Sequence, residues 1–119
     1  MPDSLFDRLG GEEGIARFVN DLVDLHLANP TISTRFAATD PVKLKKMATD
    51  FVVTGTGGPE TYQGRDMRTV HANMNISDNE FMAVVDDAME ALDRQGAAQR
   101  VKEEVLFILY SLRPEVVGI

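Results

Sequence analysis

Along most of the chain, apolar residues recur every three or four positions, which is the spacing of one face of an α-helix. The sharpest example follows Pro41, where the charged residues fall off the apolar face. Thr39 or Asp40 can cap this helix, and Pro41 suits its first position because proline lacks an amide hydrogen that would be unsatisfied there. The apolar face consists of Leu44, Met47, Ala48 and Phe51.

The same spacing predicts three further helices, over residues 12–28, from Ser77 to a stop at Gly96, and over residues 98–112. Ser77 begins a capping box with the glutamate three residues later. A helix of one or two turns is expected over residues 3–9, and residues 31–36 are expected to form a connecting turn. The predicted inner faces are Ile15, Phe18, Val19, Leu22 and Leu25, then Phe81, Val84, Val85, Ala88, Met89 and Leu92, and finally Val101, Val105, Ile108, Leu109 and Leu112. His26 continues the spacing of the first set, and the sequence does not decide whether it faces the pocket or the outside.

No useful stretch alternates between apolar and polar residues, so the pattern predicts no β-strand. The predicted fold class is therefore all-α, with about four main helices in a single domain over residues 1–119. A hydrophobic content of 44% fits a packed globular chain rather than a disordered one.

The charge balance narrows the choice of partners. A formal net charge of −7 disfavours binding to nucleic acid or to an anionic membrane surface, because both need a basic face. The absence of cysteine excludes disulfides, thiolate metal sites and thioether attachment of haem. No apolar run approaches the roughly 20 residues that span a bilayer. No signal peptide is evident either, so a cytoplasmic location is expected.

The segment 61–71 carries the most distinctive chemistry. It follows a glycine-rich break and ends in His71, one of two histidines in the chain. Arg68 lies three residues before His71, so one helical turn would place both on the same side. An imidazole beside a cation suggests an axial metal ligand next to an anion clamp. A surface or core histidine is the more usual explanation of a single histidine.

Several motifs occur together in an order that resembles the truncated haemoglobins, specifically those of group I. The resemblance covers essentially the whole chain and implies a shortened globin, in which two helical hairpins cross around a haem. The motifs are Leu9-Gly10-Gly11, Arg35-Phe36, Gly57-Gly58-Pro59, Tyr62, the run from Gly64 to His71, and the helix that begins with a capping box.

The resemblance implies that His71 is the proximal ligand of the haem iron, a role that neutral imidazole fills well. Arg68 resembles the cation that pairs with a haem propionate, and Tyr62 lies near the same edge. The family's optional covalent link uses a late histidine; none follows His71, so the implied cofactor is haem b held non-covalently. The other implied cofactor-binding residues, all of which simple core packing also explains, are Phe36 on the porphyrin face, Leu44 over the iron, Met47, Ala48 one turn beyond Leu44, Phe51 deeper in the pocket, Phe81 and Val85.

The chain departs from the family on the distal side. The family commonly has a tyrosine where this chain has Val23 and a glutamine where it has Ala48, and Leu44 offers no hydrogen-bond donor either. Such a donor stabilises dioxygen by roughly 1–3 kcal/mol, or about ten- to a hundredfold in affinity. An apolar pocket therefore favours carbon monoxide relative to dioxygen. Neither tight dioxygen storage nor efficient nitric-oxide dioxygenase activity is expected.

Two functions suit this pattern. The leading one is reversible binding of a small gaseous ligand (dioxygen, carbon monoxide or nitric oxide) in transport or sensing. The alternative is electron transfer to a redox partner protein through a six-coordinate haem, with Met47, or else His26, as the sixth ligand. Packing in the core is the simpler role for Met47. A haem-free interaction module would leave His71 and Arg68 unexplained. No hydrolytic site is evident, and without a distal acid or base any peroxidase activity would be weak.

Overall fold

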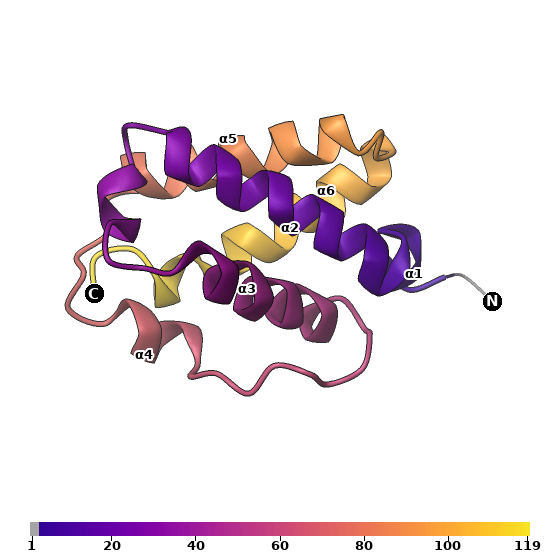
Figure 1. Ribbon diagram of the computed structural model, residues 1–119, viewed down its shortest axis with the longest axis horizontal. Coiled ribbons are helices and arrows are strands. Elements are labelled where there is room, and N and C mark those ends of the chain that lie inside the picture. Colours follow the sequence, from indigo (N-terminus) through magenta and orange to yellow (C-terminus); the bar gives the residue numbers. More distant parts are fainter. Residues whose placement is uncertain (1–2) are drawn as a thin grey trace.

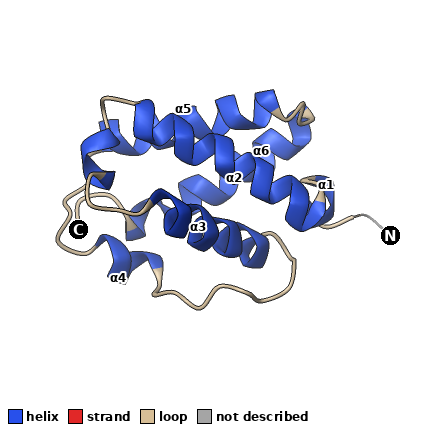
Figure 2. Ribbon diagram, viewed as in Figure 1, coloured by secondary structure: helices blue, strands red, loops and turns tan. Residues whose placement is uncertain are grey.

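The computed structural model describes residues 3–119, and their regular structure is helical apart from one isolated β-bridge between Ile76 and Val117 (Figure 2). This confirms the all-α prediction, and the long helices begin and end within a few residues of the predicted positions. In chain order the elements are α1 (Leu5–Arg8), α2 (Gly11–Ala28), the 3-10 helix η1 (Ser33–Phe36), α3 (Pro41–Gly55), α4 (Met67–His71), α5 (Asp78–Arg94), α6 (Gln99–Leu112) and the 3-10 helix η2 (Arg113–Glu115).

The helix α2 lies at the centre of the packing, in contact with both α3 and α5. In Figure 1, α2 and α3 lie in front, and α5 and α6 lie behind them. The helix α4 stands at the end of a long connection that leaves α3, close to the C-terminal end of the chain (Figure 1). The helix α4 contacts η2, and Ile76 forms a bridge with Val117. These contacts hold the segment from α4 to Ile76 against the last residues of the chain.

Glycines determine the sharp corner between α1 and α2. Gly10 and Gly11 adopt the left-handed backbone region, with φ of 97° and 68°, which other residues rarely enter. One turn into α2, a Cβ at Gly14 would lie 2.1 Å from the carbonyl oxygen of Leu9. Only glycine therefore allows α1 to pack this closely on the start of α2.

Side-chain caps begin the two helices that border the candidate site. The carboxylate of Asp40 accepts the amide of Val42 at 2.9 Å, with Pro41 at the first helical position. At the start of α5, Ser77 and Glu80 form the predicted capping box, with each side chain accepting the other residue's amide hydrogen. Both helix starts are therefore encoded locally in the sequence.

The buried core differs from the predicted inner faces in two ways: some predicted residues are only half-buried, and some residues that were not predicted are buried. In α6, Val101 and Val105 are buried, but Ile108, Leu109 and Leu112 are only half-buried because they line a cavity. In α5 the packing reaches more of the helix surface than predicted, because both α2 and α6 contact it; Ala83, Asp87 and Ala91 are buried there as well. The buried cluster comprises Leu5, Ile15, Phe18, Val19, Val23, Val53, Ala88, Ala91, Leu92, Val101 and Val105.

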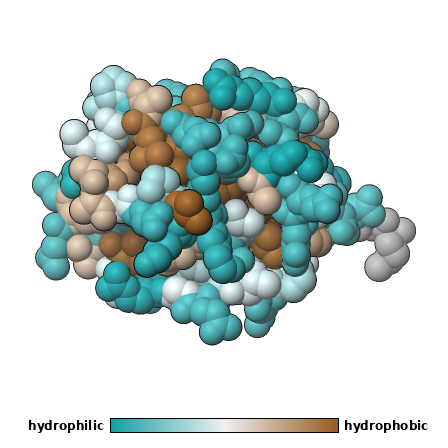
Figure 3. Space-filling view, in the orientation of Figure 1, coloured by the Kyte–Doolittle hydropathy of each residue, from teal (hydrophilic) through white to brown (hydrophobic). Residues whose placement is uncertain are grey.

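The exterior seen in Figure 3 is mostly hydrophilic, and its apolar atoms show in several separate areas. No helix formed by residues 3–119 combines the length and the apolar character that crossing a membrane requires.

Candidate functional site

His71 ends the short helix α4, and its ring is fixed by its own backbone. The Nδ1 atom lies 2.8 Å from the carbonyl oxygen of Met67, one turn earlier. A carbonyl only accepts, so Nδ1 carries the hydrogen and Nε2 keeps its lone pair for a ligand. Asp66 begins this helix by accepting the amide of Thr69 at 2.7 Å, and its hydrogen bonds with Thr69 lower the pKa of its carboxyl group. Within the segment 61–71, residues 67–71 thus form a capped helix, whereas residues 61–66 have no helix or strand.

A cavity of about 140 Å³ opens beside His71. Its wall is mainly apolar, and it is built from η1, α5, the connection after His71 and the end of the chain. It brings together Phe36, His71 and Phe81, which are three of the predicted cofactor-binding residues. The lining residues are Ile32, Arg35, Phe36, His71, Met74, Ile76, Glu80, Phe81, Val84 and Val116.

The two charged residues of this wall, Arg35 and Glu80, pair with each other. Arg35 binds Glu80 with two hydrogen bonds, Nε to Oε2 at 2.6 Å and Nη2 to Oε1 at 2.9 Å. Its Nη1 donates to the carbonyl oxygen of Met74 at 2.9 Å. The guanidinium lowers the pKa of Glu80 to about 2. Arg35 therefore joins η1 to α5 and to the connection that follows His71.

The ring of Phe36 stacks on the ring of His26. The two rings are parallel within 6°, with centroids 5.9 Å apart. The Nδ1 atom of His26 lies 2.7 Å from a carboxylate oxygen of Asp87, and both residues are buried. Burial lowers the pKa of His26, while Asp87 acts in the opposite direction. This arrangement gives His26 a packing and hydrogen-bonding role that requires no iron.

A second cavity, of about 190 Å³, lies between α2, α3, α5 and α6 and is apolar throughout. It includes Ala48 and Phe51 of the predicted set, and Val84 borders both this cavity and the one beside His71. Leu44 packs half-buried against the core cluster. The lining residues are Phe18, Leu22, Ala48, Phe51, Val52, Gly55, Thr56, Val84, Ala88, Val105, Ile108, Leu109 and Leu112.

Tyr62 supports this second wall from outside. Its ring meets Phe51 edge to face, with centroids 5.2 Å apart, and its hydroxyl donates to the carbonyl oxygen of Arg65 at 2.6 Å. The amide of Tyr62 donates to the hydroxyl of Thr54 at 3.1 Å. Tyr62 therefore orders the connection between α3 and α4.

Five predicted residues lie outside both cavity linings: Leu44 and Tyr62, whose contacts are given above, and Arg68, Met47 and Val85. Arg68 is exposed, and its guanidinium approaches the carbonyl oxygen of Pro114 at 3.5 Å. Met47 exposes 50% of its surface, so it lies at the margin of the α3 face that was predicted to point inwards. Val85 is buried, and its neighbour Val84 takes the position that borders both cavities.

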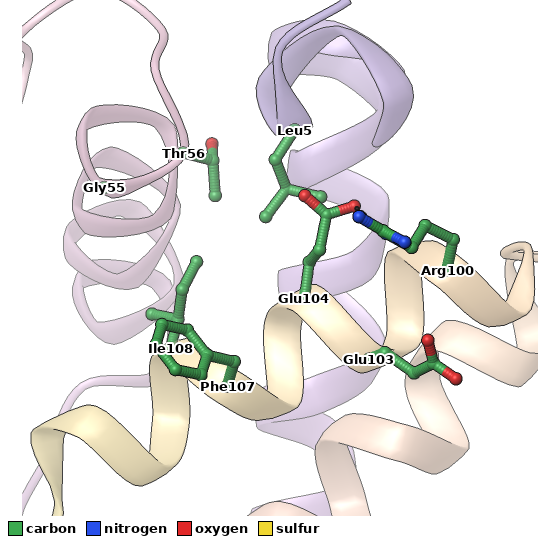
Figure 4. A pocket seen from close by; sticks show the side chains of 8 residues that line it. All are labelled: Leu5, Gly55, Thr56, Arg100, Glu103, Glu104, Phe107 and Ile108. Carbon is green, nitrogen blue, oxygen red and sulfur yellow. Dashed lines mark ion pairs between the residues drawn. The ribbon is translucent and has the colours of Figure 1, made fainter.

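A cavity of about 400 Å³ lies away from His71, where α1, the end of α3 and α6 meet (Figure 4). Glu104 pairs there with Arg8 and with Arg100, the latter at 3.6 Å. Leu5, Phe107 and Ile108 supply its apolar wall. Its lining contains no histidine, and both of its acids have partners: Glu104 pairs with two arginines, and Glu103 accepts a hydrogen bond from the side-chain amide of Gln99 at 3.3 Å. It is therefore not the candidate site.

Sequence reasoning missed Arg35, Glu80 and Asp87 as members of this region. Arg35 was noted only as the neighbour of Phe36, and Glu80 only as part of the capping box. Arg35 and Glu80 are 45 residues apart in the sequence, and His26 and Asp87 are 61 apart. No local spacing in the sequence therefore indicates either pair.

The chain is similar along most of its length to known proteins. Residues 4–117 match the family described as bacterial-like globin. A group 1 truncated haemoglobin of Mycolicibacterium paratuberculosis is 30% identical over 115 residues, which cover 97% of this chain and 85% of that protein. A group 1 truncated haemoglobin of Tetrahymena pyriformis is 27% identical over 117 residues, which cover 98% and 97% of the two chains.

Solved structures show the same fold. The Fe(III) form of truncated haemoglobin from Tetrahymena pyriformis superposes with a TM-score of 0.94 at 26% identity, covering 98% of this chain and all (100%) of that one. The 2/2 haemoglobin of Synechococcus, in the cyanomet state with covalently attached haem, superposes with a TM-score of 0.90 at 27% identity, covering 97% and 98%. The predicted arrangement of two crossed helical hairpins is therefore confirmed.

Proposed function

Because the chain belongs to the group 1 truncated haemoglobins of the bacterial-like globin family, we propose that it holds haem b non-covalently on His71 and binds a small gaseous ligand reversibly. The observation that carries this proposal is the hydrogen bond from His71 Nδ1 to the Met67 carbonyl oxygen at 2.8 Å. It fixes the ring and its tautomer and leaves Nε2 as the free donor atom, which is the usual preparation of a metal-binding histidine.

The surrounding residues fit a flat apolar cofactor. Phe36 and Phe81 provide aromatic walls beside His71, and Ala48 and Phe51 line the apolar cavity towards α3. Haem would supply an iron centre that binds a diatomic gas. The chain would supply the axial nitrogen, the low polarity around it, and Arg68 as an exposed cation for a propionate.

The distal wall determines which gas is favoured. Leu44, Ala48 and Val23 carry no hydrogen-bond donor, and the cavity that Ala48 borders is apolar throughout. A donor would stabilise polarised dioxygen by roughly 1–3 kcal/mol over an apolar wall. With haem bound as proposed, the protein therefore favours carbon monoxide relative to dioxygen. This preference suits sensing or transient binding better than storage.

The alternative function, electron transfer through a six-coordinate haem, gains no support from the positions of its two candidate ligands. Met47 is half-exposed, and the His26 ring is engaged by Asp87 and by Phe36. We therefore propose an open sixth position.

The test is the absorption spectrum of the loaded protein, ferric and then ferrous, before and after carbon monoxide. A five-coordinate ferrous spectrum that changes promptly with the gas supports the proposal, and a six-coordinate low-spin ferrous spectrum contradicts the open position. His71→Ala should lose tight haem binding, and added imidazole should restore it by filling the place of the missing ring. Stoichiometric haem with an unchanged spectrum in His71→Ala would overturn the assignment.

A further inference from the structure

Two polar side chains lie buried within the helical core, and they bind each other. His26 on α2 is 7% exposed and Asp87 on α5 is 9% exposed, with Nδ1 and Oδ2 2.7 Å apart. Removing a carboxylate and an imidazole from water is unfavourable unless they are well paired, and an apolar pair of similar volume is often as stable. General stability therefore does not by itself explain why this pair occupies the interface of α2 and α5.

The pair is connected to the turn that leads to Phe36. Both carboxylate oxygens of Asp87 lie 3.3 Å from the amide nitrogen of the Asn29 side chain. The side-chain oxygen of Asn29 accepts the amide of Thr31 at 3.1 Å, and its carbonyl accepts the amides of Ile32 and Ser33 at 3.1 and 2.8 Å. The carboxylate of Asp87 on α5 thus binds the side chain of Asn29, the residue on which the turn between α2 and η1 is built.

The ring of His26 acts on the far end of η1. It stacks on Phe36 within 6° of parallel, and Phe36 lines the cavity beside His71. Burial lowers the pKa of His26, which favours the neutral ring that donates from Nδ1 to Asp87. On the other side, Arg35 joins the same short helix to Glu80. Phe36 is thereby held from two directions, although η1 has only four residues of its own.

We propose that His26 and Asp87 are positioning residues for the cofactor: they hold Phe36 in the cavity wall and so slow the loss of haem. This inference rests on the proposed function, since Phe36 is there assigned to the haem face. His26 acts through the ring of Phe36, and Asp87 acts through His26 and Asn29.

The experiment measures haem dissociation from the loaded protein into excess apomyoglobin. His26→Gln keeps a donor for Asp87 but removes the stacked ring, and Asp87→Ala removes the acceptor. Both should lose haem about three- to tenfold faster than the wild type, which is the range expected for losing one aromatic pair. Asp87→Asn keeps an acceptor oxygen for His26. Its rate of haem dissociation should therefore remain within about twofold of the wild-type rate.

A matched control separates positioning from stability. Val101→Ala removes buried volume at a site that lines neither of the two cavities, so it should lower the unfolding midpoint without changing the haem dissociation rate. Hydrogen exchange of the loaded protein adds a second readout. The amides of Thr31, Ile32 and Ser33 should exchange faster in Asp87→Ala and not in Val101→Ala.

Each outcome has a distinct meaning. If His26→Gln and Asp87→Ala match the wild-type dissociation rate, or if Val101→Ala loses haem equally fast, the positioning role is wrong. If Asp87→Ala does not fold, the comparison of His26→Gln with Asp87→Asn decides the same point. A wild-type protein that takes up no haem overturns the proposed function and this inference together. Normal wild-type uptake with unchanged variant rates overturns only this inference.

Discussion

The pairing of Arg35 with Glu80 predicts a specific loss of stability in acid. Glu80→Gln should remove the charge pairing while keeping the capping box, because glutamine also accepts the Ser77 amide. A carboxyl pKa lowered from 4.5 to about 2 corresponds to roughly 3 kcal/mol if it is fully expressed. Solvent reaches 32% of the Arg35 side chain and 17% of that of Glu80, and screening reduces the contribution of such a pair. We therefore expect Glu80→Gln to lower the free energy of unfolding by about 1 kcal/mol at neutral pH.

The sign of the pH dependence follows from the direction of the shift. The pKa of Glu80 is lower in the folded state, so its contribution is complete above pH 4.5 and is lost as the pH falls towards about 2. Urea unfolding at several pH values, followed by circular dichroism, should show the difference between wild type and Glu80→Gln narrowing over that range. Glu103→Gln makes the same change in net charge at an exposed site without an ion pair among the described residues, and it is the control. Equal stability of Glu80→Gln and wild type at neutral pH, or a difference that persists at pH about 2, would refute the reasoning.

Other substitutions test separate parts of the molecule. Ala48→Gln adds a donor to the apolar cavity and should slow dioxygen dissociation about ten- to a hundredfold in stopped-flow experiments, whereas Ala48→Leu should not. Tyr62→Phe loses one hydrogen bond but keeps the aromatic contact, so thermal melts should show a loss of about 1 kcal/mol, and Tyr62→Ala should lose more. Gly14→Ala should destabilise strongly, by more than about 2 kcal/mol, because its Cβ would lie 2.1 Å from the Leu9 carbonyl oxygen. Gly55→Ala, which meets no heavy atom within 4 Å, should stabilise by about 0.5–1 kcal/mol in the same assay.

The helices were predictable because their signals are local. Two helix starts are marked by residues at most four positions apart, and the structure has both caps. These residues are Asp40 with Pro41 and Ser77 with Glu80. Burial was less predictable. Ile108 has the spacing of a core residue, yet it is half-buried because it borders a cavity, and periodicity cannot distinguish a core from the wall of a cavity.

The same difference between local signals and long-range packing applies to the candidate site. His71 was identified from a local run of residues, and its hydrogen bond to Met67 is also local, one helical turn back. His26 could be placed only at helical spacing on its helix, and the sequence left open whether it faces the pocket or the outside. Its partner Asp87 looks, in the sequence, like an ordinary charge on the polar side of a helix. Pairings across 61 residues depend on how α2 and α5 cross, which no local pattern encodes.

Apart from the Nε2 atom of His71, the polar side chains near the two cavities share one property: they are already used within the protein. Arg35 binds Glu80 and Met74, Asp87 binds His26, and the hydroxyl of Tyr62 binds a backbone carbonyl. These bonds hold the wall in place but leave no donor directed into the apolar cavity that Ala48 borders. Under the proposed function, discrimination between gases would then rest on shape and access rather than on hydrogen bonding. A single donor introduced at Ala48 should accordingly change dioxygen binding much more than carbon monoxide binding, since only the former develops charge that a donor can stabilise.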